Sequence, residues 1–358
     1  MSATREKVVN KGGVRPVFDW TPDAMTALFE SWGHPAYRAL QVLEWVYQHD
    51  VHSYDEMTNL PKALRARLSA ELPMYESTLV PQQVSDDGTI KLLLRWPDGA
   101  ASECVLIPDG DRRTACISSQ VGCPVRCVFC ASGLGGLERQ LSTGQIVEQA
   151  MRIRHLCRNG RPLSNVVFMG LGEPLANYDA TVRAVRTINA RWGLNIGARK
   201  ITVSTVGLPK PMCRLADERM QITLALSLHA PTDELRKRII PWAERVSLSS
   251  LIEAANYYFD RTGREVTLEY ILLGGLNDTP EHARQLATVS RRMRSNVNLL
   301  LYNPVEGLEY QRPRDSDAER FLMILRERGT NAHLRRSRGL DIDAACGQLR
   351  RREQIKTG

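Results

Sequence analysis

The chain has 358 residues, a length that suits two or three domains or one barrel with an appendage. Lysine and arginine outnumber aspartate and glutamate by 48 to 40, and the net charge of +8 fits either polyanion binding or a solvated basic face. No apolar run approaches the roughly 20 residues of a membrane span, and the first residues lack the apolar core of a secretion signal. We therefore expect a soluble cytoplasmic protein, whose eight cysteines indicate thiol or metal chemistry rather than a disulfide framework.

The first 112 residues predict an arm, a helical domain and a β-hairpin. We expect residues 1–16 to form a flexible arm. Three helical patterns predict a small helical domain over residues 17–75, with starts near Thr21, Arg38 and Leu60. Residues 76–112 alternate in polarity around two turn signals and predict a β-hairpin linker, with turns at Asp86-Asp87-Gly88 and Pro97-Asp98-Gly99.

Strand and helix patterns alternate after residue 112. Six stretches predict strands, at 114–118, 164–169, 200–205, 222–228, 266–272 and 297–301. Five stretches have helical periodicity, at 143–158, 178–191, 248–261, 281–293 and 316–328. This alternation predicts an α/β fold with a partial (βα)6 barrel over 113–349, followed by a basic tail at 350–358. In such barrels the chemistry takes place in the loops at the carboxyl ends of the strands.

Three closely spaced cysteines follow the first of these strands. Cys123, Cys127 and Cys130 have CxxxCxxC spacing, which lets three thiolates surround one metal centre. A [4Fe-4S] cluster held by three cysteines keeps one iron open for another ligand. A structural zinc site is the alternative, but it normally needs a second cysteine pair or nearby histidines, and no histidine follows within twenty residues of Cys130.

Short polar side chains occur where the other strands end. They lie in the segments Gly170-Leu171-Gly172-Glu173-Pro174, Ser204-Thr205-Val206-Gly207, Ser227-Leu228-His229-Ala230 and Tyr302-Asn303-Pro304. Taken singly, the glycines of this set are typical of a plain turn and the histidine of a structural residue. Gathered around one open iron, they suit a small ligand with hydroxyl groups and an amino-acid end, and S-adenosylmethionine has both.

Two of the remaining cysteines differ from the others. Cys346 lies in a glycine-flanked loop after an acidic pair, and Cys116 ends the first barrel strand. Buried, inert cysteine is the default reading of the other three, Cys104, Cys157 and Cys213.

Together these motifs resemble the RlmN/Cfr family of radical SAM RNA adenine methyltransferases. The resemblance covers residues 20–349 and rests on Cys116-Ile-Ser-Ser-Gln-Val-Gly-Cys-x3-Cys-x2-Cys, Met169-Gly-Leu-Gly-Glu-Pro174, Ser227-Leu-His-Ala230, Tyr302-Asn-Pro304 and Asp341-Ile-Asp-Ala-Ala-Cys-Gly-Gln-Leu349. It implies a partial radical SAM barrel, a small helical N-terminal domain that helps to hold RNA, and a ping-pong reaction that uses two molecules of S-adenosylmethionine.

The resemblance also implies roles for single residues. It assigns one [4Fe-4S] cluster to Cys123, Cys127 and Cys130. It assigns S-adenosylmethionine to Gly172, Glu173, Ser204, Ser227, Leu228, His229 and Asn303. Cys346 would carry the methyl group and Cys116 would be the resolving thiol that forms a transient disulfide with it. Glu103 would accept the proton.

The implied activity is formation of 2-methyladenosine in 23S rRNA and tRNA, by a monomer supplied with electrons by flavodoxin or ferredoxin. Methylation of C8 of the rRNA adenine and a non-catalytic RNA-binding module with a structural metal remain alternatives. Near the methyl-carrying cysteine we expect phosphate contacts from six arginines, Arg335, Arg336, Arg338 and Arg350 to Arg352.

Overall fold

The structure is a computed structural model that describes residues 15–49, 51–157 and 161–349. The chain divides into two compact units, Met1–Glu76 and Ser77–Gly358. Most of the expected arm and the whole expected basic tail lie outside the described residues. Within the described ranges, no helix combines the length and the apolar character that crossing a membrane requires.

Three α-helices form the first unit, as the sequence predicts: α1 (Pro22–Ser31), α2 (Tyr37–Gln48) and α3 (Lys62–Glu71). The hydroxyl of Thr21 caps α1 by accepting a hydrogen bond from the amide of Ala24 at 3.3 Å. The apolar sides of α1 and α2 are buried at Met25, Phe29, Val42, Leu43 and Val46.

The second unit is built on one twisted sheet, which has eleven strands in the described part of the chain. The antiparallel strands are β1 (Thr78–Leu79), β2 (Gln83–Val84), β3 (Ile90–Arg95) and β4 (Ala101–Asp109), and β4 pairs with β5 (Arg112–Cys116). A parallel run continues through β8 (Asn165–Phe168), β9 (Ile201–Thr205), β10 (Thr223–Ser227), β11 (Val266–Leu272), β12 (Ser295–Leu301) and β13 (Ala332–Arg335). The hairpin of β3 and β4 therefore extends the barrel sheet.

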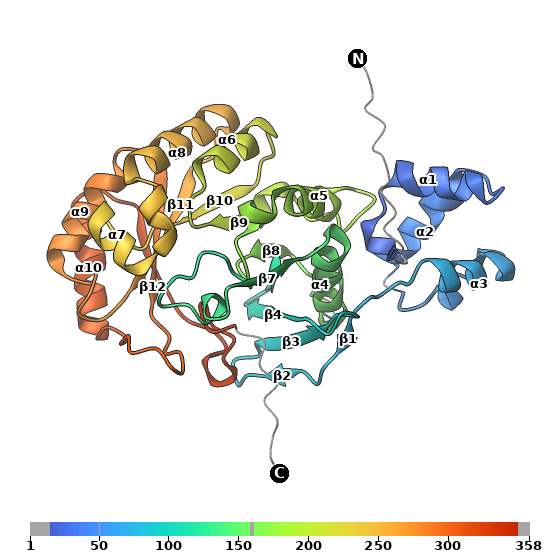
Figure 1. The fold of residues 1–358 in the computed structure, drawn as a ribbon, viewed down its shortest axis with the longest axis horizontal. Helices are drawn as coiled ribbons and strands as arrows, with labels where there is room; N and C mark the ends of the chain where they lie inside the picture. Colours follow the sequence, from blue (N-terminus) through green and yellow to red (C-terminus); the bar gives the residue numbers. More distant parts are fainter. Residues whose placement is uncertain (1–14, 50, 158–160, 350–358) are drawn as a thin grey trace, which may run out of the picture. The chain divides into compact units, whose positions relative to one another are not determined.

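The six predicted strands are confirmed, and β13 is a seventh parallel strand that the sequence did not predict. Seven helices follow the strands: α4 (Thr143–Leu156), α5 (Tyr178–Asn189), α6 (Pro209–Asp217), α7 (Asp233–Ile239), α8 (Leu248–Thr262), α9 (Pro280–Ser290) and α10 (Asp315–Glu327). Figure 1 shows α6, α8, α9 and α10 outside the arc of parallel strands. This arrangement is the predicted α/β partial barrel.

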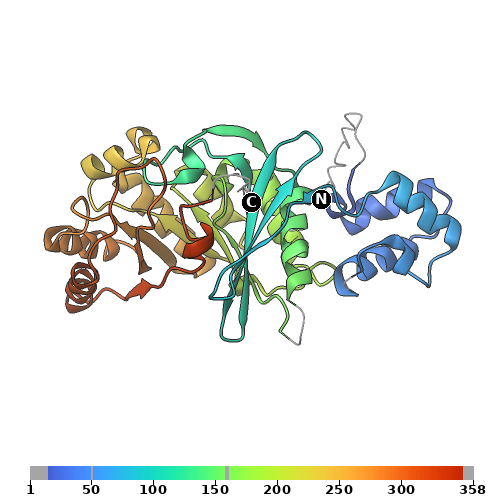
Figure 2. The ribbon, with the colours of Figure 1, turned by 90° about the horizontal axis from the view of Figure 1, so that it is seen from below.

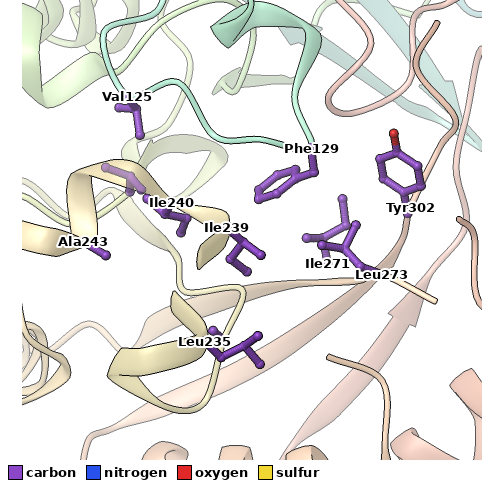
Figure 3. Close-up of a cluster of buried hydrophobic side chains, with 11 residues drawn as sticks. Val125, Phe129, Leu235, Ile239, Ile240, Ala243, Ile271, Leu273 and Tyr302 are labelled. Atoms are coloured by element: carbon purple, nitrogen blue, oxygen red, sulfur yellow. The ribbon is translucent and has the colours of Figure 1, made fainter. Parts of the chain in front are cut away.

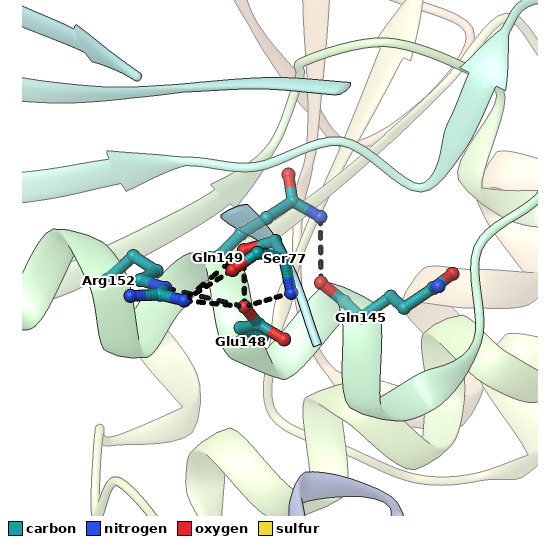
Figure 4. A network of polar contacts seen from close by, with 5 residues as sticks. All are labelled: Ser77, Gln145, Glu148, Gln149 and Arg152. Carbon is teal, nitrogen blue, oxygen red and sulfur yellow. Dashed lines mark hydrogen bonds and ion pairs between the residues drawn. The ribbon is translucent and has the colours of Figure 1, made fainter. Parts of the chain in front are cut away.

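Figure 2 shows the antiparallel strands, in cyan, as a long extension of the sheet beside the green helix α4. Polar side chains of α4 fix two segments of the chain (Figure 4). Glu148 accepts hydrogen bonds from the backbone and hydroxyl of Ser77 and pairs with Arg152 at 3.3 Å. Gln149 bonds both the amide and the carbonyl of Ser118, at 2.8 and 2.9 Å. The hydrogen bonds between Gln149 and Ser118 hold the chain shortly before the cysteine loop.

Candidate active site

The three cysteines lie in a loop that a small second sheet closes. Strand β6 (Gln120–Gly122) precedes the loop and pairs with β7 (Leu137–Gln140) after it. The amide of Cys123 donates to the carbonyl of Gly136 at 3.0 Å, and a Cβ atom at Gly122 would lie 2.0 Å from that carbonyl oxygen. Glycine is therefore required where the two ends of the loop meet.

The cysteine loop rests on an apolar cluster at the mouth of the barrel. Phe129 of the loop belongs to one buried cluster with Ile271, Leu273 and Tyr302, which come from the ends of β11 and β12 (Figure 3). The three cysteines are half-buried against the same cluster. The loop is also tied by its backbone, because the amide of Val128 donates to the carbonyl of Ile239 at 3.1 Å. The cysteines are thus held at the carboxyl ends of the parallel strands, as the sequence predicts.

Burial raises the pKa of all three thiols, and that of Cys123 reaches about 12. A metal centre that binds thiolates must overcome this penalty, and a nearby cation helps. Arg236 is such a cation. It is fully buried, its charge lowers the pKa of Cys127, and its Nη1 atom has no hydrogen-bond partner. A buried cation with an unused donor beside three thiols fits an anionic iron–sulfur cluster.

The same residue contacts two strand ends. Arg236 donates from Nη2 to the carbonyl of Val206 and from Nε to the carbonyl of Leu228, the latter at 3.3 Å. In the described part of the chain, no three His, Cys, Asp or Glu side chains converge closely enough for one metal ion. The cysteines of a cubane bind different iron atoms, so they do not have to meet at one point.

Glu173 is buried at the end of β8 and links two strand-end loops. Its carboxylate accepts hydrogen bonds from the amides of Leu175, at 3.0 Å, and Val206, at 2.7 Å. Burial raises the pKa of Glu173 to about 7, although these hydrogen bonds act in the opposite direction. Next to it, Gly172 has a φ of 104°, and a Cβ atom there would lie 2.6 Å from Gln120.

Ser204 and Ser227 lie side by side at the ends of β9 and β10, with 3.3 Å between their hydroxyl oxygens. His229 follows with a φ of 58°, and its ring meets Phe129 of the cysteine loop edge-on at 5.0 Å. Burial lowers the pKa of His229 to about 3, with Arg236 adding to the effect, so the ring is neutral. Its Nδ1 accepts from the amide of Ile271 at 3.0 Å, which assigns the proton to Nε2.

The loop of Cys346 is held from several sides. Nδ2 of Asn303 donates to the carbonyl of Cys346 at 3.3 Å, and the cysteine loop contributes the amide of Ala131, which donates to Gly347 at 2.8 Å. Ser132 bonds the carbonyl of Leu349 at 2.9 Å.

The antiparallel strands hold the other end of the Cys346 loop. Asp341 accepts from the hydroxyl of Ser85, and Asp87 accepts from the amide of Gly339 at 3.0 Å. The loop thus lies between the cysteine loop and the turn that joins β2 to β3.

Cys346 is the one exposed cysteine of the eight, all of which belong to the described residues. Surrounding atoms still displace most bulk water, and this desolvation, with the nearby Glu269 adding, raises the pKa of Cys346 to about 11. Cys116 is buried, and desolvation raises its pKa, with Cys346 as the neighbouring charge that adds to the shift. The two thiols are therefore electrostatic neighbours, and Cys130 of the cysteine loop also acts on Cys346.

Glu103 is buried in β4, with 2 % of its surface exposed, and is not on the open face of a hairpin. It pairs with Lys91 of β3, whose ammonium nitrogen lies 3.5 Å from its carboxylate. Among the other cysteines, Cys104 is buried as expected, whereas Cys157 and Cys213 are half-buried.

Of the six arginines expected to contact phosphate, three lie in the described residues. Arg335 ends β13, is exposed and acts electrostatically on Glu269 and Cys346, while Arg338 pairs with Asp109 at 3.2 Å. Arg336 is exposed. Arg350 to Arg352 lie outside the described residues. The basic cluster at 291–294 precedes β12, so it lies at the end of the strands opposite the cysteine loop.

Sequence reasoning missed three buried charged residues near the site: Lys91, Arg236 and Glu269. A usable signal existed for two of them. Lys91 interrupts the apolar run of β3, and Glu269 interrupts that of β11, which is buried along its whole length. An ionisable residue in such a strand indicates either a buried partner or a functional role.

Comparison with known proteins agrees with this geometry. The Radical SAM superfamily matches residues 117–287, and the ribosomal RNA large subunit methyltransferase N-terminal domain matches residues 16–73. A radical SAM methyltransferase from Sphaerobacter thermophilus superposes with a TM-score of 0.92 at 45% identity, over 94% of this chain and all of that one. The fold and the cysteine loop thus define a radical SAM protein.

Curated relatives give the family. A probable dual-specificity RNA methyltransferase RlmN 3 of Opitutus terrae is 46% identical over 94% of each chain. An RlmN protein of Rhodopirellula baltica is 43% identical over 95% of this chain and 92% of its own. The chain belongs to the RlmN family. Membership of the radical SAM superfamily implies a [4Fe-4S] cluster and S-adenosylmethionine.

Proposed function

We propose that the protein methylates C2 of an adenine in 23S rRNA and in tRNA by a ping-pong reaction that uses two molecules of S-adenosylmethionine. The observation that carries the proposal is the position of the Cys346 loop, which packs against Cys116 through Ala344 and Leu349 and is hydrogen-bonded through Gly347 to Ala131, next to Cys130. A methyl-carrying thiol needs both neighbours, a radical source and a second thiol. The names of the relatives, dual-specificity RNA methyltransferases, support the substrate class.

The target carbon explains why a radical route is needed. C2 of adenine lies between two ring nitrogens, is electron-poor and has no lone pair to attack a sulfonium. Polar methyl transfer from S-adenosylmethionine therefore fails there, whereas a carbon radical can add to the ring. The methyl group must first be placed on a residue that can later carry the radical, and we assign this role to Cys346.

In the proposed reaction, Cys346 first receives a methyl group and then forms a covalent bond to the RNA. The Cys346 thiolate attacks the methyl carbon of the first S-adenosylmethionine, so that a carbon–sulfur bond to Cys346 forms and S-adenosylhomocysteine leaves with the electron pair of the broken sulfonium bond. A [4Fe-4S] cluster held by Cys123, Cys127 and Cys130 would supply the electron for reductive cleavage of the second S-adenosylmethionine, and the S-methyl group of Cys346 would then give a hydrogen atom to the deoxyadenosyl radical. The methylene radical on Cys346 then adds to C2 and joins protein and RNA covalently.

Resolution of this adduct requires a base and a thiol. Glu103 accepts the proton from C2, while the C–H electron pair stays on the ring. The Cys116 thiolate then forms a disulfide with Cys346, the carbon–sulfur bond breaks with its electrons on carbon, and that carbon takes up a proton. One electron is left over and returns to the low-potential carrier, flavodoxin or ferredoxin, that started the reaction.

Side chains at the strand ends suit the amino-acid and ribose parts of S-adenosylmethionine. We assign this ligand to Gly172, Glu173, Ser204, Ser227, Leu228, His229 and Asn303, and the cluster to Cys123, Cys127 and Cys130. Glu173 uses its carboxylate oxygens on backbone amides, but each oxygen keeps a further lone pair for an ammonium group. The neutral His229 has Nε2–H available as a donor.

The RNA must present an unstacked adenine, which loops provide at the lowest energy. Arg335, the last residue of β13, and Arg336, which follows it, are exposed and suit contacts to the flanking phosphates. The helical first unit matches the family's N-terminal domain and is proposed to hold RNA as well.

The test is nucleoside mass spectrometry of 23S rRNA and tRNA after incubation with anaerobically reconstituted protein and a reductant. We expect 2-methyladenosine, and none from the Cys346→Ala variant. 8-Methyladenosine would instead establish the alternative ring position. RNA binding without formation of 5′-deoxyadenosine would refute an enzymatic role and favour the RNA-binding module.

A further inference from the structure

The hydrogen-bond register of β3, β4 and β5 aligns charged and thiol side chains on one face of the sheet. Lys91 is opposite Val105, and Val105 is opposite Cys116. Paired residues in neighbouring strands point to the same face, and so do residues two apart in one strand. Glu103 therefore shares this face with Lys91 and Cys116.

The Cys346 loop covers this face. Ala344 and Leu349 of the loop pack in one buried cluster with Val105 and Cys116. The loop and the sheet face are further joined by one polar contact: the ammonium of Lys91 donates to the carbonyl of Asp343 at 3.2 Å. The same ammonium lies 3.5 Å from the Glu103 carboxylate, and both side chains are almost fully buried, 8 % and 3 % exposed.

We propose that Lys91 is a positioning residue that holds the Glu103 carboxylate beside the Cys346 loop, so that Glu103 can accept the ring proton of the RNA adduct. This inference rests on the proposed function, because it gives Glu103 the role of base. Lys91 is not assigned a contact with the methyl group or with the adenine, and it acts through its contacts with Glu103 and Asp343.

Two physical effects carry the proposal. A buried carboxylate without a partner is strongly disfavoured, and a cation at this distance favours the ionised form that can accept a proton. A lysine that also bonds the Asp343 carbonyl ties that carboxylate to the segment whose cysteine carries the adduct. In the step itself the C–H bond breaks, an O–H bond forms on Glu103, and no electrons leave the ring.

The experiment compares Lys91→Gln and Lys91→Arg with the wild-type protein under single-turnover conditions. Three quantities are measured: 5′-deoxyadenosine, methylated Cys346 peptide, and RNA covalently bound to protein. In Lys91→Gln we expect the first two within about twofold of wild type, while adduct accumulates and release of methylated RNA slows by about tenfold or more. Lys91→Arg keeps the charge and should restore most of the release rate.

Two controls separate a positioning role from a structural one. Lys200→Gln removes an exposed lysine at the opposite end of β9 and should match wild type in all three measurements. In a Glu103→Gln background, Lys91→Gln should add no further loss, because the residue through which it acts is already disabled. The double variant buries no unpaired charge, so this comparison remains valid if Lys91→Gln alone folds poorly.

Release of methylated RNA by Lys91→Gln at the wild-type rate would overturn the inference. So would an equal fall in all three measured quantities, which would indicate a purely structural role. Failure of the wild-type protein to methylate RNA would instead refute the proposed function itself, and the two failures are therefore distinguishable.

Discussion

Nδ2 of Asn303 donates a hydrogen bond to the backbone carbonyl of Cys346 at 3.3 Å, and Oδ1 of the same side chain accepts from the hydroxyl of Ser337 at 2.8 Å. Asn303 ends a barrel strand and is almost fully buried. One side chain thus connects the strand ends to which we assign S-adenosylmethionine with the loop of Cys346, which we propose carries the methyl group. A ligand that engages Asn303 acts directly on the position of Cys346.

Replacing Asn303 with alanine should loosen the Cys346 loop. Loss of a buried hydrogen bond typically removes about 1 kcal/mol, which corresponds to roughly fivefold faster local opening. Hydrogen exchange of residues 344–348 in the ligand-free protein measures the effect. Ser337→Ala is the matched control, because it leaves the bond to Cys346 in place. Equal exchange in Asn303→Ala and wild type would contradict the anchoring role.

Replacing Cys116 with serine should trap the RNA on the protein. A hydroxyl group is a poor nucleophile toward a thioether sulfur, so the adduct on Cys346 would form and remain. A denaturing gel with end-labelled RNA detects it as a band that migrates with the protein. Cys104→Ser, at a buried neighbouring cysteine, should release methylated RNA normally. Release at the wild-type rate by Cys116→Ser would refute the resolving role.

Glu269 should make the folded protein less stable as pH rises. Burial raises its folded-state pKa from 4.5 to about 7, although a hydrogen bond from Asn298 opposes the shift. The folded state therefore keeps a proton that the unfolded state loses, and stability falls between pH 4.5 and 7. At roughly 1.4 kcal/mol per unit of pKa, the contribution approaches about 3 kcal/mol.

Urea denaturation of Glu269→Gln and wild type at pH 5 and pH 8 tests this linkage. The variant should gain stability relative to wild type as pH rises, because the glutamine has no proton to lose. Glu253→Gln, on the exposed side of α8, should show a constant difference at both pH values. A constant difference for Glu269→Gln would exclude the predicted linkage.

Replacing Arg236 with methionine should affect both stability and the metal centre. The carbonyls of Val206 and Leu228 would lose a donor inside the protein, at an expected loss of about 2–4 kcal/mol. Removing a cation beside Cys127 should also make the reduction potential of a reconstituted cluster more negative, on the order of tens of millivolts. Redox titration followed by electron paramagnetic resonance measures this shift. Arg245→Met removes an exposed arginine nearby and should leave the potential unchanged.

The parallel core was predictable because its strands are long apolar runs between clear helical patterns. Strand β13 was missed because its four residues, Ala-His-Leu-Arg, are only partly buried and are followed by further arginines. Helix α7 has seven residues, too few for a periodic pattern, and α6 begins with Pro-Lys-Pro, which resembles a loop. These elements are fixed by packing on the sheet rather than by local sequence.

At the candidate site, spacing alone predicted the three-cysteine loop, because its members lie within eight residues. The pairing of Lys91 with Glu103 depends on strand register, and the position of Arg236 depends on how α7 folds back over the cysteine loop. Neither relationship leaves a local signature. Contacts between residues distant in sequence therefore determine how the charges of this site are arranged.

One edge of the barrel sheet is formed by β1 and β2, which both pair with β3, and the other edge is formed by β13. No backbone pairing joins the two edges in the described residues. The segment after β13 lies between these two edges. It is hydrogen-bonded to the turn between β2 and β3, because Asp341 accepts from the Ser85 hydroxyl and the Gly339 amide donates to Asp87. Detaching this segment breaks a few side-chain hydrogen bonds, whereas separating two paired strands of the sheet would break a whole ladder of backbone hydrogen bonds. The segment that closes the gap between the two edges of the sheet therefore also carries Cys346, so local opening of this segment would move that thiol without breaking the sheet.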